Sequence, residues 1–303
     1  MAHLESSNLF SVKGLVAVIT GGGSGIGQMM AHALDANGAS KVFIIGRREQ
    51  KLKDTAASAV NGSIIPVIGD ISSKESLQAA YNQIAMQTKY IDLLIANSGT
   101  VGPRGMNISK PGGSPATLQE LREHLWKTPM EEFSQVSHVN VTGTFYTIVA
   151  FLPLLEAANQ QRPHPTPGVL SPPRPQVIVI SSVAGFLRVG MTGYAYHISK
   201  AGVNMLIKMV STMLTRHHIR VNGIAPGPYY SELSASIYER LGVVGQGVTD
   251  GSFPPENFPL TRSGGEEDIA GLIIWMAGAA GGYLNGSIVV TDGGRAGTVP
   301  STY

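Results

Sequence analysis

The most informative absence is cysteine, because the 303-residue sequence contains none. Disulfides, thiolate metal sites and cysteine nucleophiles are therefore excluded. The adjacent His217 and His218 do not indicate a metal site either, since neighbouring side chains point apart. We expect no metal.

An excess of either charge is also absent. The 22 basic residues nearly balance the 20 acidic ones, and the net charge is only +2. Such a balance gives no electrostatic reason to bind nucleic acid or an anionic membrane. We therefore expect neither among the partners.

A hydrophobic run long enough to cross a membrane is missing as well. The most apolar stretch, residues 269–284, is shorter than a membrane span and rich in glycine, which favours a buried helix running into a loop. The first residues, MAHLESSNLFSVKG, lack the basic and then apolar regions of a signal peptide. We expect a protein of the cytoplasm.

What the chain does have is apolar content, with 43% hydrophobic and 14% charged residues, enough for a large core. Continuous Val/Ile-rich runs alternate with helix-like segments, as in a parallel sheet covered by helices on both faces. This order predicts one α/β domain over residues 1–303, a doubly wound, Rossmann-type parallel sheet flanked by helices. The runs expected as strands are 15–21, 41–46, 64–70, 91–97, 176–182, 219–227 and 287–294, and the first helices are expected at 27–38 and 48–60.

Two segments interrupt this rhythm. Residues 101–117 are rich in glycine and proline, and residues 159–175 are rich in proline, so neither favours regular structure. The strand pattern resumes after each of them. We therefore predict surface insertions within one domain rather than linkers between domains.

A glycine-rich loop, TGGGSGIG at residues 20–27, follows the first expected strand and opens the first helix. Its glycines permit a tight turn and close approach to a pyrophosphate, which the helix N-terminus then attracts. A phosphate-transfer loop would require Lys and then Ser/Thr after the last glycine, whereas Gln28 and Met29 follow Gly27. We predict a dinucleotide site whose loop contacts come from Gly21, Gly23, Ser24, Gly25, Ile26 and Gly27.

The end of the second expected strand indicates which dinucleotide binds. An NAD site places an acidic residue there for the ribose 2′-hydroxyl, but this chain has Arg47 followed by Arg48. A guanidinium matches a phosphate, which predicts NADP(H), with Arg47 as the main contact and Arg48 as the secondary one. The alternative is two solvated arginines at a helix start, a position that disfavours cations.

The stretch TGYAYHISKAG holds two tyrosines and one lysine. In a helix, residues four apart share a face, so Tyr196 meets Lys200 while Tyr194 meets Ile198. Such a pair alone is usually a surface contact. For Tyr194 we expect a place in the substrate-pocket wall or in packing.

Further motifs complete a recognisable order. They are IGD with Asp70, ANSG with Asn97 and Gly99, HVNVTG with Asn140, ISSVAG with Ser182, and APGPYYSE at 225–232. Together with the TGxxxGxG form of the glycine loop and the YxxxK pair, they resemble the short-chain dehydrogenase/reductase family over about residues 12–294. Any one motif could arise by chance, but the series is highly specific.

The resemblance implies an active site and further coenzyme contacts. It implies that Tyr196 transfers a proton, that Lys200 lowers the pKa of Tyr196 and holds the nicotinamide ribose, that Ser182 hydrogen bonds the substrate oxygen, and that Asn140 anchors a relay water. The coenzyme contacts it implies are Asp70, Ile71, Asn97, Gly99, Tyr196, Lys200, Pro226, Gly227, Tyr229 and Ser231.

Three departures from the family pattern stand out. Ala96 replaces an asparagine, the gap from Ser182 to Tyr196 is one residue longer than is common, and the two insertions exceed a minimal member. The longer gap predicts a bulged loop and a reshaped pocket wall. The single histidine inside the YxxxK motif, His197, is expected to be exposed.

Residues 228–262 are expected to form a substrate lid. The apolar and aromatic side chains that predominate there favour a hydrophobic ketone or secondary alcohol, in a protein similar to fungal relatives, some of which act in secondary metabolism. The resemblance also implies a homodimer or homotetramer. Two alternatives stay open: non-redox chemistry (an epimerase, dehydratase or cyclase) and a silent NADP-binding scaffold.

Overall fold

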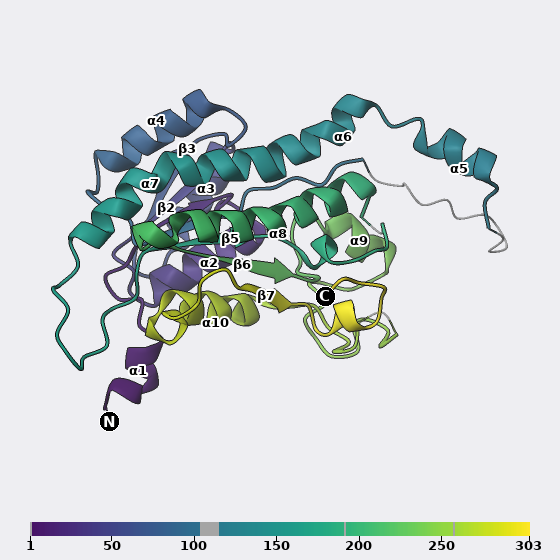
Figure 1. The fold of residues 1–303 in the computed structure, drawn as a ribbon. Coiled ribbons are helices and arrows are strands. Elements are labelled where there is room, and N and C mark those ends of the chain that lie inside the picture. Colours follow the sequence, from purple (N-terminus) through teal and green to yellow (C-terminus); the bar gives the residue numbers. More distant parts are fainter. Residues whose placement is uncertain (1, 104–114, 191, 257) are drawn as a thin grey trace.

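The computed structural model describes residues 2–103, 115–190, 192–256 and 258–303. At its centre lies a parallel sheet of seven strands in the order β3-β2-β1-β4-β5-β6-β7 (Figure 1). Every neighbouring pair is parallel, which confirms the predicted doubly wound fold. The strands are β1 (Val16–Thr20), β2 (Lys41–Gly46), β3 (Ile64–Ile68), β4 (Leu93–Ala96), β5 (Gln176–Ile180), β6 (Arg220–Pro226) and β7 (Ile288–Thr291).

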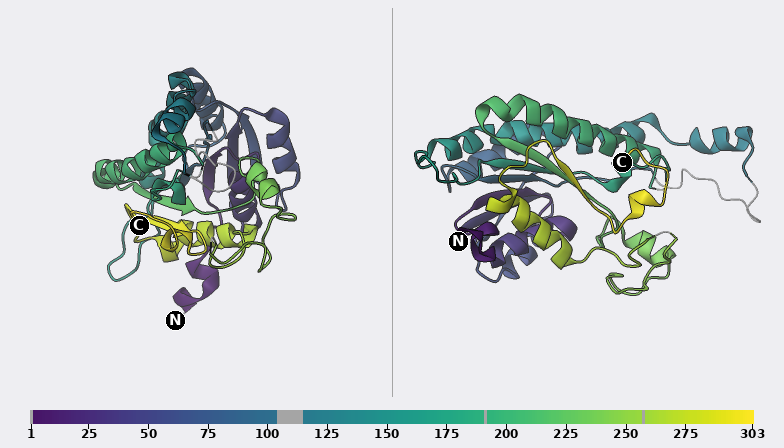
Figure 2. Two further views of the ribbon diagram at one scale, coloured as in Figure 1. Left: turned by 90° about the vertical axis from the view of Figure 1, so that its right-hand side faces the viewer. Right: turned by 60° about the horizontal axis from the view of Figure 1, so that its bottom comes forward.

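Helices cover both faces of the sheet. On one face pack α4, α7 and α8, and on the other pack α2, α3 and α10 (Figures 1 and 2). The helices of the described residues include α2 (Gly25–Ala36), α3 (Glu49–Ala57), α4 (Lys74–Ala85), α5 (Leu118–Leu125), α6 (Met130–Ser137), α7 (Thr144–Gln160), α8 (Tyr194–Leu214), α9 (Ala235–Arg240) and α10 (Glu266–Ala277), besides the short α1 (Ser6–Leu9).

The strand runs are continuously apolar because both faces of each strand are buried. In β1 all five residues are buried, and alternate side chains enter different cores. Val16 and Val18 face the core beneath α4, α7 and α8, whereas Ala17 and Ile19 face the core beneath α2, α3 and α10. If only every second residue of a strand were apolar, the strand would contribute apolar side chains to only one of the two cores.

The strand order reverses between β1 and β4, which are neighbours in the sheet although β2 and β3 intervene in the chain. At such a reversal, the connections leaving the two strands go to opposite faces and open a crevice at the carboxyl ends of the strands. The glycine loop leaves β1 here, and the segment carrying Asn97 leaves β4. The fold therefore places the predicted dinucleotide site in this crevice.

The structure describes the second expected insertion throughout and only the two ends of the first. Within 101–117, residues 104–114 lie outside the described residues. In 159–175, Asn159 and Gln160 complete α7, and the remainder forms no helix or strand. The side chain of Arg162 donates to the carbonyls of Pro172 and Pro173, which ties the two limbs of this segment together.

One continuous helical stretch, Met130–Gln160, is long and apolar enough to cross a membrane by length and composition alone. Its position assigns it another role, because Phe151 and Leu155 are fully buried against the sheet. Within the stretch, residues His138–Gly143 form a π-helical turn between α6 and α7. The apolar composition is therefore that of a core helix. Beyond its N-terminal end, α5 extends away from the sheet (Figures 1 and 2).

Candidate active site

The glycine loop has a backbone that side chains would obstruct. Gly21 has a φ of +70°, and a Cβ on Gly27 would lie 2.2 Å from the carbonyl oxygen of Gly21. Glycine at both positions lets the chain turn sharply from β1 into α2. The α2 N-terminus then presents its free amide groups to the crevice, a cradle that suits a pyrophosphate.

Asn97 braces this loop from the neighbouring strand. Its Nδ2 donates to the carbonyl oxygens of Thr20, at 2.9 Å, and of Gly21, at 3.2 Å. In return the Thr20 hydroxyl oxygen accepts from the backbone N–H of Asn97, at 3.0 Å, and of Ser98, at 3.1 Å. The structure thus turns Asn97 toward the loop backbone. The substituted position, Ala96, is the buried last residue of β4.

At the adenosine end, Asp70 and Ile71 follow β3. Burial raises the pKa of Asp70, but hydrogen bonds from Ser72 and the charge of Arg47 outweigh it, so the net shift is downward. Ile71 is buried and packs against the backbone of Gly143. This arrangement gives an apolar floor beside an ionised carboxylate.

The two predicted arginines lie differently. Arg47 leaves 78% of its side chain exposed and reaches Asp70 only at 3.9 Å. Arg48 donates to the hydroxyl of Ser24 in the glycine loop, at 3.1 Å, and pairs with Glu232, at 2.7 Å. Both guanidinium groups therefore border the crevice, but Arg48 is the one that already contacts the loop.

The YxxxK pair stands on the first turns of α8, beside the end of β5. Lys200 is buried, its Nζ lies 5.8 Å from the centre of the Tyr196 ring, and it donates to the carbonyl oxygen of Ile180 at 2.9 Å. Burial lowers the pKa of Lys200 to about 8. Ser182 follows β5, and its Oγ accepts from the backbone N–H of Ala184 at 3.1 Å. Its own hydrogen therefore remains available for another acceptor.

The expectation of a lowered Tyr196 pKa is wrong for the protein by itself. Burial raises the pKa of Tyr196, and a hydrogen bond with the Ser182 side chain opposes that shift without reversing it. The reason is that removing the phenolate from water costs more than one hydrogen bond returns. At neutral pH the phenol therefore carries its proton.

Asn140 lies in the π-helical turn and is fully buried. Its Nδ2 donates to the carbonyl oxygen of Thr100, at 2.9 Å, and to Ser199 Oγ, at 3.0 Å, while its Oδ1 accepts from the N–H of Thr100, at 2.8 Å. Ser199 in turn donates to the carbonyl oxygen of Tyr196 at 2.7 Å. The Asn140 side chain thus ties the loop after β4 to the helix that carries Tyr196, and Gly99 leaves room between Asn140 and Lys200.

Sequence reasoning missed Ser199 and Thr100 as partners of Asn140. Ser199 stands inside the YxxxK motif, one residue before the lysine, and this position is the signal that could have identified it. Thr100 contributes through its backbone, which no residue type reveals.

The segment between Ser182 and Tyr196 is held by the C-terminal tail, residues 298–303. Leu187 and Ser301 form an antiparallel bridge, and the N–H of Thr302 donates to the carbonyl oxygen of Phe186 at 2.8 Å. The rings of Phe186 and Tyr303 meet edge to face at 5.3 Å. The longer gap is therefore accommodated by a loop that the tail supports.

His197 is buried, so the expectation that it is exposed is wrong. Its Nε2 accepts from the N–H of Thr192 at 3.4 Å, which places the ring beneath the 182–196 loop. Burial also lowers the pKa of His197. A neutral ring suits this place, because a protonated Nε2 could not accept that hydrogen bond.

The expected lid begins where β6 ends at Pro226. The N–H of Gly227 donates to the carbonyl oxygen of Thr291 at 2.9 Å, and the buried Tyr229 hydroxyl hydrogen bonds with Thr291 Oγ1 at 2.8 Å. Ser231 packs directly against Gly25 of the glycine loop. These contacts hold the start of the lid over the N-terminus of α2.

Most lid aromatic residues pack against each other, and two of them, Tyr230 and Tyr238, also line a pocket within the lid. Tyr238 stacks edge to face on Tyr230 and on Phe253, and Phe253 in turn contacts Phe258. Arg295 closes the cluster by lying over the Phe258 ring at 4.5 Å. The abundance of aromatic residues in 228–262 is thus partly explained by the internal packing of the lid.

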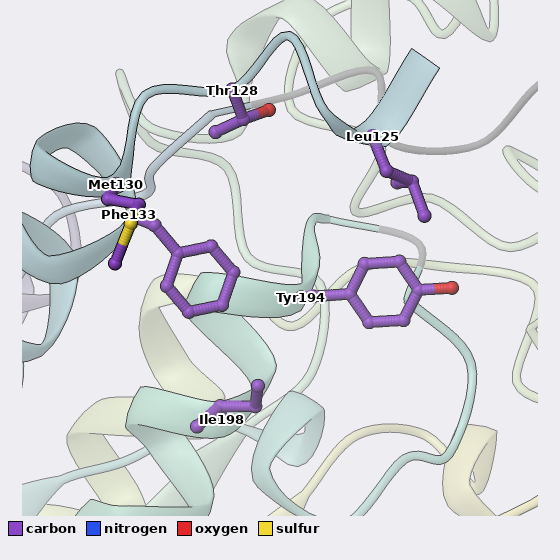
Figure 3. Close-up of a pocket in the computed structure, with 6 residues that line it drawn as sticks. All are labelled: Leu125, Thr128, Met130, Phe133, Tyr194 and Ile198. Atoms are coloured by element: carbon purple, nitrogen blue, oxygen red, sulfur yellow. The ribbon is translucent and has the colours of Figure 1, made fainter. Parts of the chain in front are cut away.

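Tyr194 lines an open apolar hollow of about 440 Å³ on the outer side of α8 (Figure 3). Tyr194 and Ile198 share a helix face that points away from the one carrying Tyr196. The hollow is therefore a neighbour of the reaction centre and not the reaction centre itself. Its walls are Leu125, Thr128, Met130, Phe133, Tyr194 and Ile198.

Comparison with known proteins agrees with this geometry. The sequence profile of the family described as short chain dehydrogenase matches residues 15–242. The chain is 43% identical to the short-chain dehydrogenase/reductase PhomF of Diaporthe leptostromiformis, over 99% of this chain and 97% of that protein. It is 35% identical to VdtF of Byssochlamys spectabilis, over 99% and 98% of the two chains.

A solved structure of similar extent is the RhlG/NADP active-site complex of Pseudomonas aeruginosa. It superposes with a TM-score of 0.75 at 31% identity and covers 95% of this chain and 98% of its own. The relatives and the solved structure agree over nearly the whole length of the chain, and the sequence profile over residues 15–242. This range includes the glycine loop, Ser182, Tyr196 and Lys200. The chain belongs to the short-chain dehydrogenase/reductase family of NAD(P)-dependent oxidoreductases.

Proposed function

We propose that this protein is an NADP(H)-dependent carbonyl reductase, or the corresponding alcohol dehydrogenase, acting on a hydrophobic ketone or secondary alcohol. The observation that carries the proposal is the meeting of Ser182, Tyr196 and Lys200 at the carboxyl ends of β4 and β5, beside the glycine loop. Such a group combines a proton donor, a hydrogen-bond donor and a cation within one crevice.

The residues divide the reaction between them. A bound nicotinamide coenzyme supplies or accepts the hydride. Tyr196 gives its hydroxyl proton to the substrate oxygen in the reductive direction, and its raised pKa keeps that proton in place at neutral pH. Ser182 donates a hydrogen bond to the same oxygen and stabilises the charge that develops there.

Lys200 and Asn140 support this proton transfer. The Lys200 ammonium, buried one turn from Tyr196, stabilises a phenolate after the proton has left. Asn140 hydrogen bonds with Ser199, and Ser199 hydrogen bonds with the carbonyl oxygen of Tyr196. These contacts hold the Tyr196 backbone in place relative to the loop after β4. We assign Asn140 a positioning role. Because its side-chain amide already hydrogen bonds with Thr100 and Ser199, a relay water would bind beside this amide.

The preference for NADP(H) rests on the arginines. Arg47 and Arg48 stand after β2, where an acidic residue would accept the 2′-hydroxyl of NAD. Their guanidinium groups suit a 2′-phosphate, which forms bidentate charge-assisted hydrogen bonds. The similar Pseudomonas aeruginosa structure is itself an NADP complex, which supports this choice.

A hydrophobic substrate is supported by the apolar composition of residues 228–262 and by the relatives. The loop after Ser182 adds the partly buried apolar side chains of Phe186 and Leu187. The Pseudomonas aeruginosa relative, described as a rhamnolipids biosynthesis 3-oxoacyl-[acyl-carrier-protein] reductase, shares 32% identity. Because the similar PhomF and VdtF are fungal proteins, we also propose, by analogy, a role in fungal secondary metabolism.

The test is NADPH consumption over a panel of hydrophobic ketones and diketones, with wild type, Tyr196→Phe and the matched control Tyr194→Phe. We expect Tyr196→Phe to lose about 10²–10⁴-fold in turnover while binding NADPH normally, because only the proton donor is removed. The control removes a hydroxyl two residues away, on another helix face, and should keep full activity. Turnover that survives in Tyr196→Phe would contradict the assignment.

Two other functions make different predictions. Non-redox chemistry would give product from the panel without net NADPH consumption, and a silent scaffold would bind NADPH without turnover. The complete Ser182, Tyr196 and Lys200 group favours the reductase, because a buried lysine beside a half-buried phenol is costly to the fold and a role in proton transfer would explain it.

We also propose that α8 pairs with a second copy of this chain. Its outer face exposes Ile198, Met205 and Met209, by 56%, 60% and 64%, in one apolar stripe that begins at the hollow around Tyr194. A second copy of the same helix would cover it. Sedimentation should show a dimer or tetramer, and Met209→Glu should yield monomers. An already monomeric wild type would refute the proposal.

A further inference from the structure

The lid and the coenzyme half of the molecule are joined by one charged cluster. Glu232, in the first residues of the lid, pairs through Oε2 with Arg48 Nη2 at 2.7 Å and through Oε1 with Lys51 Nζ at 3.4 Å. Arg48 Nη2 also donates to Ser24 Oγ at 3.1 Å. One carboxylate thus pairs with the arginine that precedes α3 and with a lysine of α3, and the arginine links it to the glycine loop.

This cluster stands at the end of the crevice where the adenosine ribose is expected. Arg48 is the residue that precedes α3, two residues after the end of β2, and Ser24 is the residue that precedes α2. The neighbour of Glu232, Ser231, packs on Gly25. A carboxylate in this position has the charge sign and the hydrogen-bonding pattern of a 2′-phosphate, and it engages the cations that such a phosphate would need.

The carboxylate is ionised at neutral pH. The Arg48 hydrogen bond and charge, together with those of Lys51, lower the pKa of Glu232. The three side chains are about half exposed, with 57% for Arg48, 48% for Lys51 and 50% for Glu232. Exposed pairs of this kind are weak and exchange readily with a stronger anion.

We propose that Glu232 is a coenzyme-specificity residue: its carboxylate occupies Arg48 and Lys51 in place of a 2′-phosphate, and a 2′-phosphorylated coenzyme must displace it. This inference rests on the proposed preference for NADP(H). Displacement removes the ion pairs that tie the start of the lid to α3, so binding of the phosphate and release of the tether are one event. A nucleotide without the phosphate leaves the tether closed.

The test uses two nucleotides that differ only in the 2′-phosphate. Calorimetric titration of 2′,5′-ADP and of 5′-AMP compares wild type with Glu232→Gln, which keeps the side-chain shape and removes the charge. We expect Glu232→Gln to bind 2′,5′-ADP about two- to fivefold more tightly, in the range of one exposed ion pair, with 5′-AMP unchanged. The gain should shrink in high salt.

Two controls distinguish the displacement of Glu232 from a general effect of removing one negative charge. Glu239→Gln, in α9 of the same lid, removes an exposed carboxylate elsewhere and should leave both affinities unchanged. In an Arg48→Gln background, Glu232→Gln should lose most of its effect, because the two substitutions act on one interaction.

The possible results distinguish a failure of the Glu232 displacement from a failure of the NADP(H) preference. If wild type binds the two nucleotides equally well, the NADP(H) preference fails, and this inference fails with it. If wild type prefers 2′,5′-ADP but Glu232→Gln weakens it, or tightens both nucleotides alike, the preference stands and the displacement of Glu232 is refuted.

Discussion

Lys200 offers the sharpest test of the physical reasoning, because its placement is costly to the fold. The side chain is 5% exposed, and the described hydrogen bond of its Nζ goes to the carbonyl oxygen of Ile180. A buried ammonium with so little compensation should destabilise the coenzyme-free protein. We therefore expect Lys200→Met, which keeps the length of the side chain and removes the charge, to abolish activity and stabilise the fold.

The size of the stabilisation expected for Lys200→Met follows from the pKa of Lys200. Burial lowers the pKa of Lys200 from 10.5 to about 8, and at 1.36 kcal/mol per pKa unit this corresponds to a penalty of about 3 kcal/mol at neutral pH. Lys200→Met also removes the hydrogen bond to Ile180, whose loss costs about 1 kcal/mol. The net expectation is a free energy of unfolding about 2 kcal/mol higher than that of wild type.

The pH dependence of the free energy of unfolding follows from the direction of the Lys200 pKa shift. Below about pH 8 the lysine is protonated in both states, and the folded protein bears the full penalty. Between pH 8 and about 10 the unfolded chain holds more protons at this site than the folded one, so the stability of wild type rises with pH. Above about 10, Tyr196 opposes this trend, because its raised pKa favours ionisation in the unfolded chain.

The measurement is urea unfolding of coenzyme-free protein between pH 7 and pH 9.5. The advantage of Lys200→Met over wild type should be largest at pH 7 and should narrow as the pH rises. Lys208→Met, on an exposed position of the same helix, removes a hydrogen bond to the carbonyl oxygen of Gly286 but no buried charge, so it should lower the free energy of unfolding by about 1 kcal/mol or less. A Lys200→Met protein less stable than wild type at pH 7, or an advantage independent of pH, would refute the argument.

Other predictions concern the supports of the site. Gly27→Ala, whose Cβ would meet the Gly21 carbonyl oxygen, should displace the loop and weaken NADPH binding about 10–100-fold in titration calorimetry. Asn97→Ala removes two hydrogen bonds to that loop and should weaken NADPH binding about tenfold by the same assay, whereas undiminished affinity would deny its bracing role. Deleting residues 299–303 should raise the KM for the ketone several-fold and leave NADPH affinity unchanged, because the backbone contacts of the tail with the described part of the chain go to the 182–196 loop.

The fold was readable from the sequence because both faces of the sheet are covered. A strand buried on both sides must be apolar throughout, so β1, β2 and β5 stand out as short Val/Ile-rich runs. Helix boundaries were less accurate: the helix expected at 48–60 ends at Ala57. Residues 58–60 of the expected helix form no regular structure, because helix ends depend on local caps and packing rather than on periodicity.

The site was readable where chemistry depends on residue type and spacing. Tyr196 and Lys200 are one helical turn apart in any helix, so their meeting needed no coordinates. Properties that depend on burial were not readable, which is why the direction of the Tyr196 pKa shift and the exposure of His197 were predicted wrongly. Contacts across long separations, such as that of Glu232 with Arg48, leave no local signal in the sequence.

The two ends of the crevice share one physical feature. At each end a cation that we propose as a coenzyme contact has a weak partner from the protein: a backbone carbonyl for Lys200, and a half-exposed carboxylate for Arg48. Without a partner, the buried ammonium would be still more costly to the fold, and the surface guanidinium would be free to move out of position. With a strong partner, neither cation would yield to a ribose hydroxyl or a phosphate. Weak internal partners therefore keep both cations in place and still leave them exchangeable, which is what a crevice must do if it is to fold empty and bind tightly.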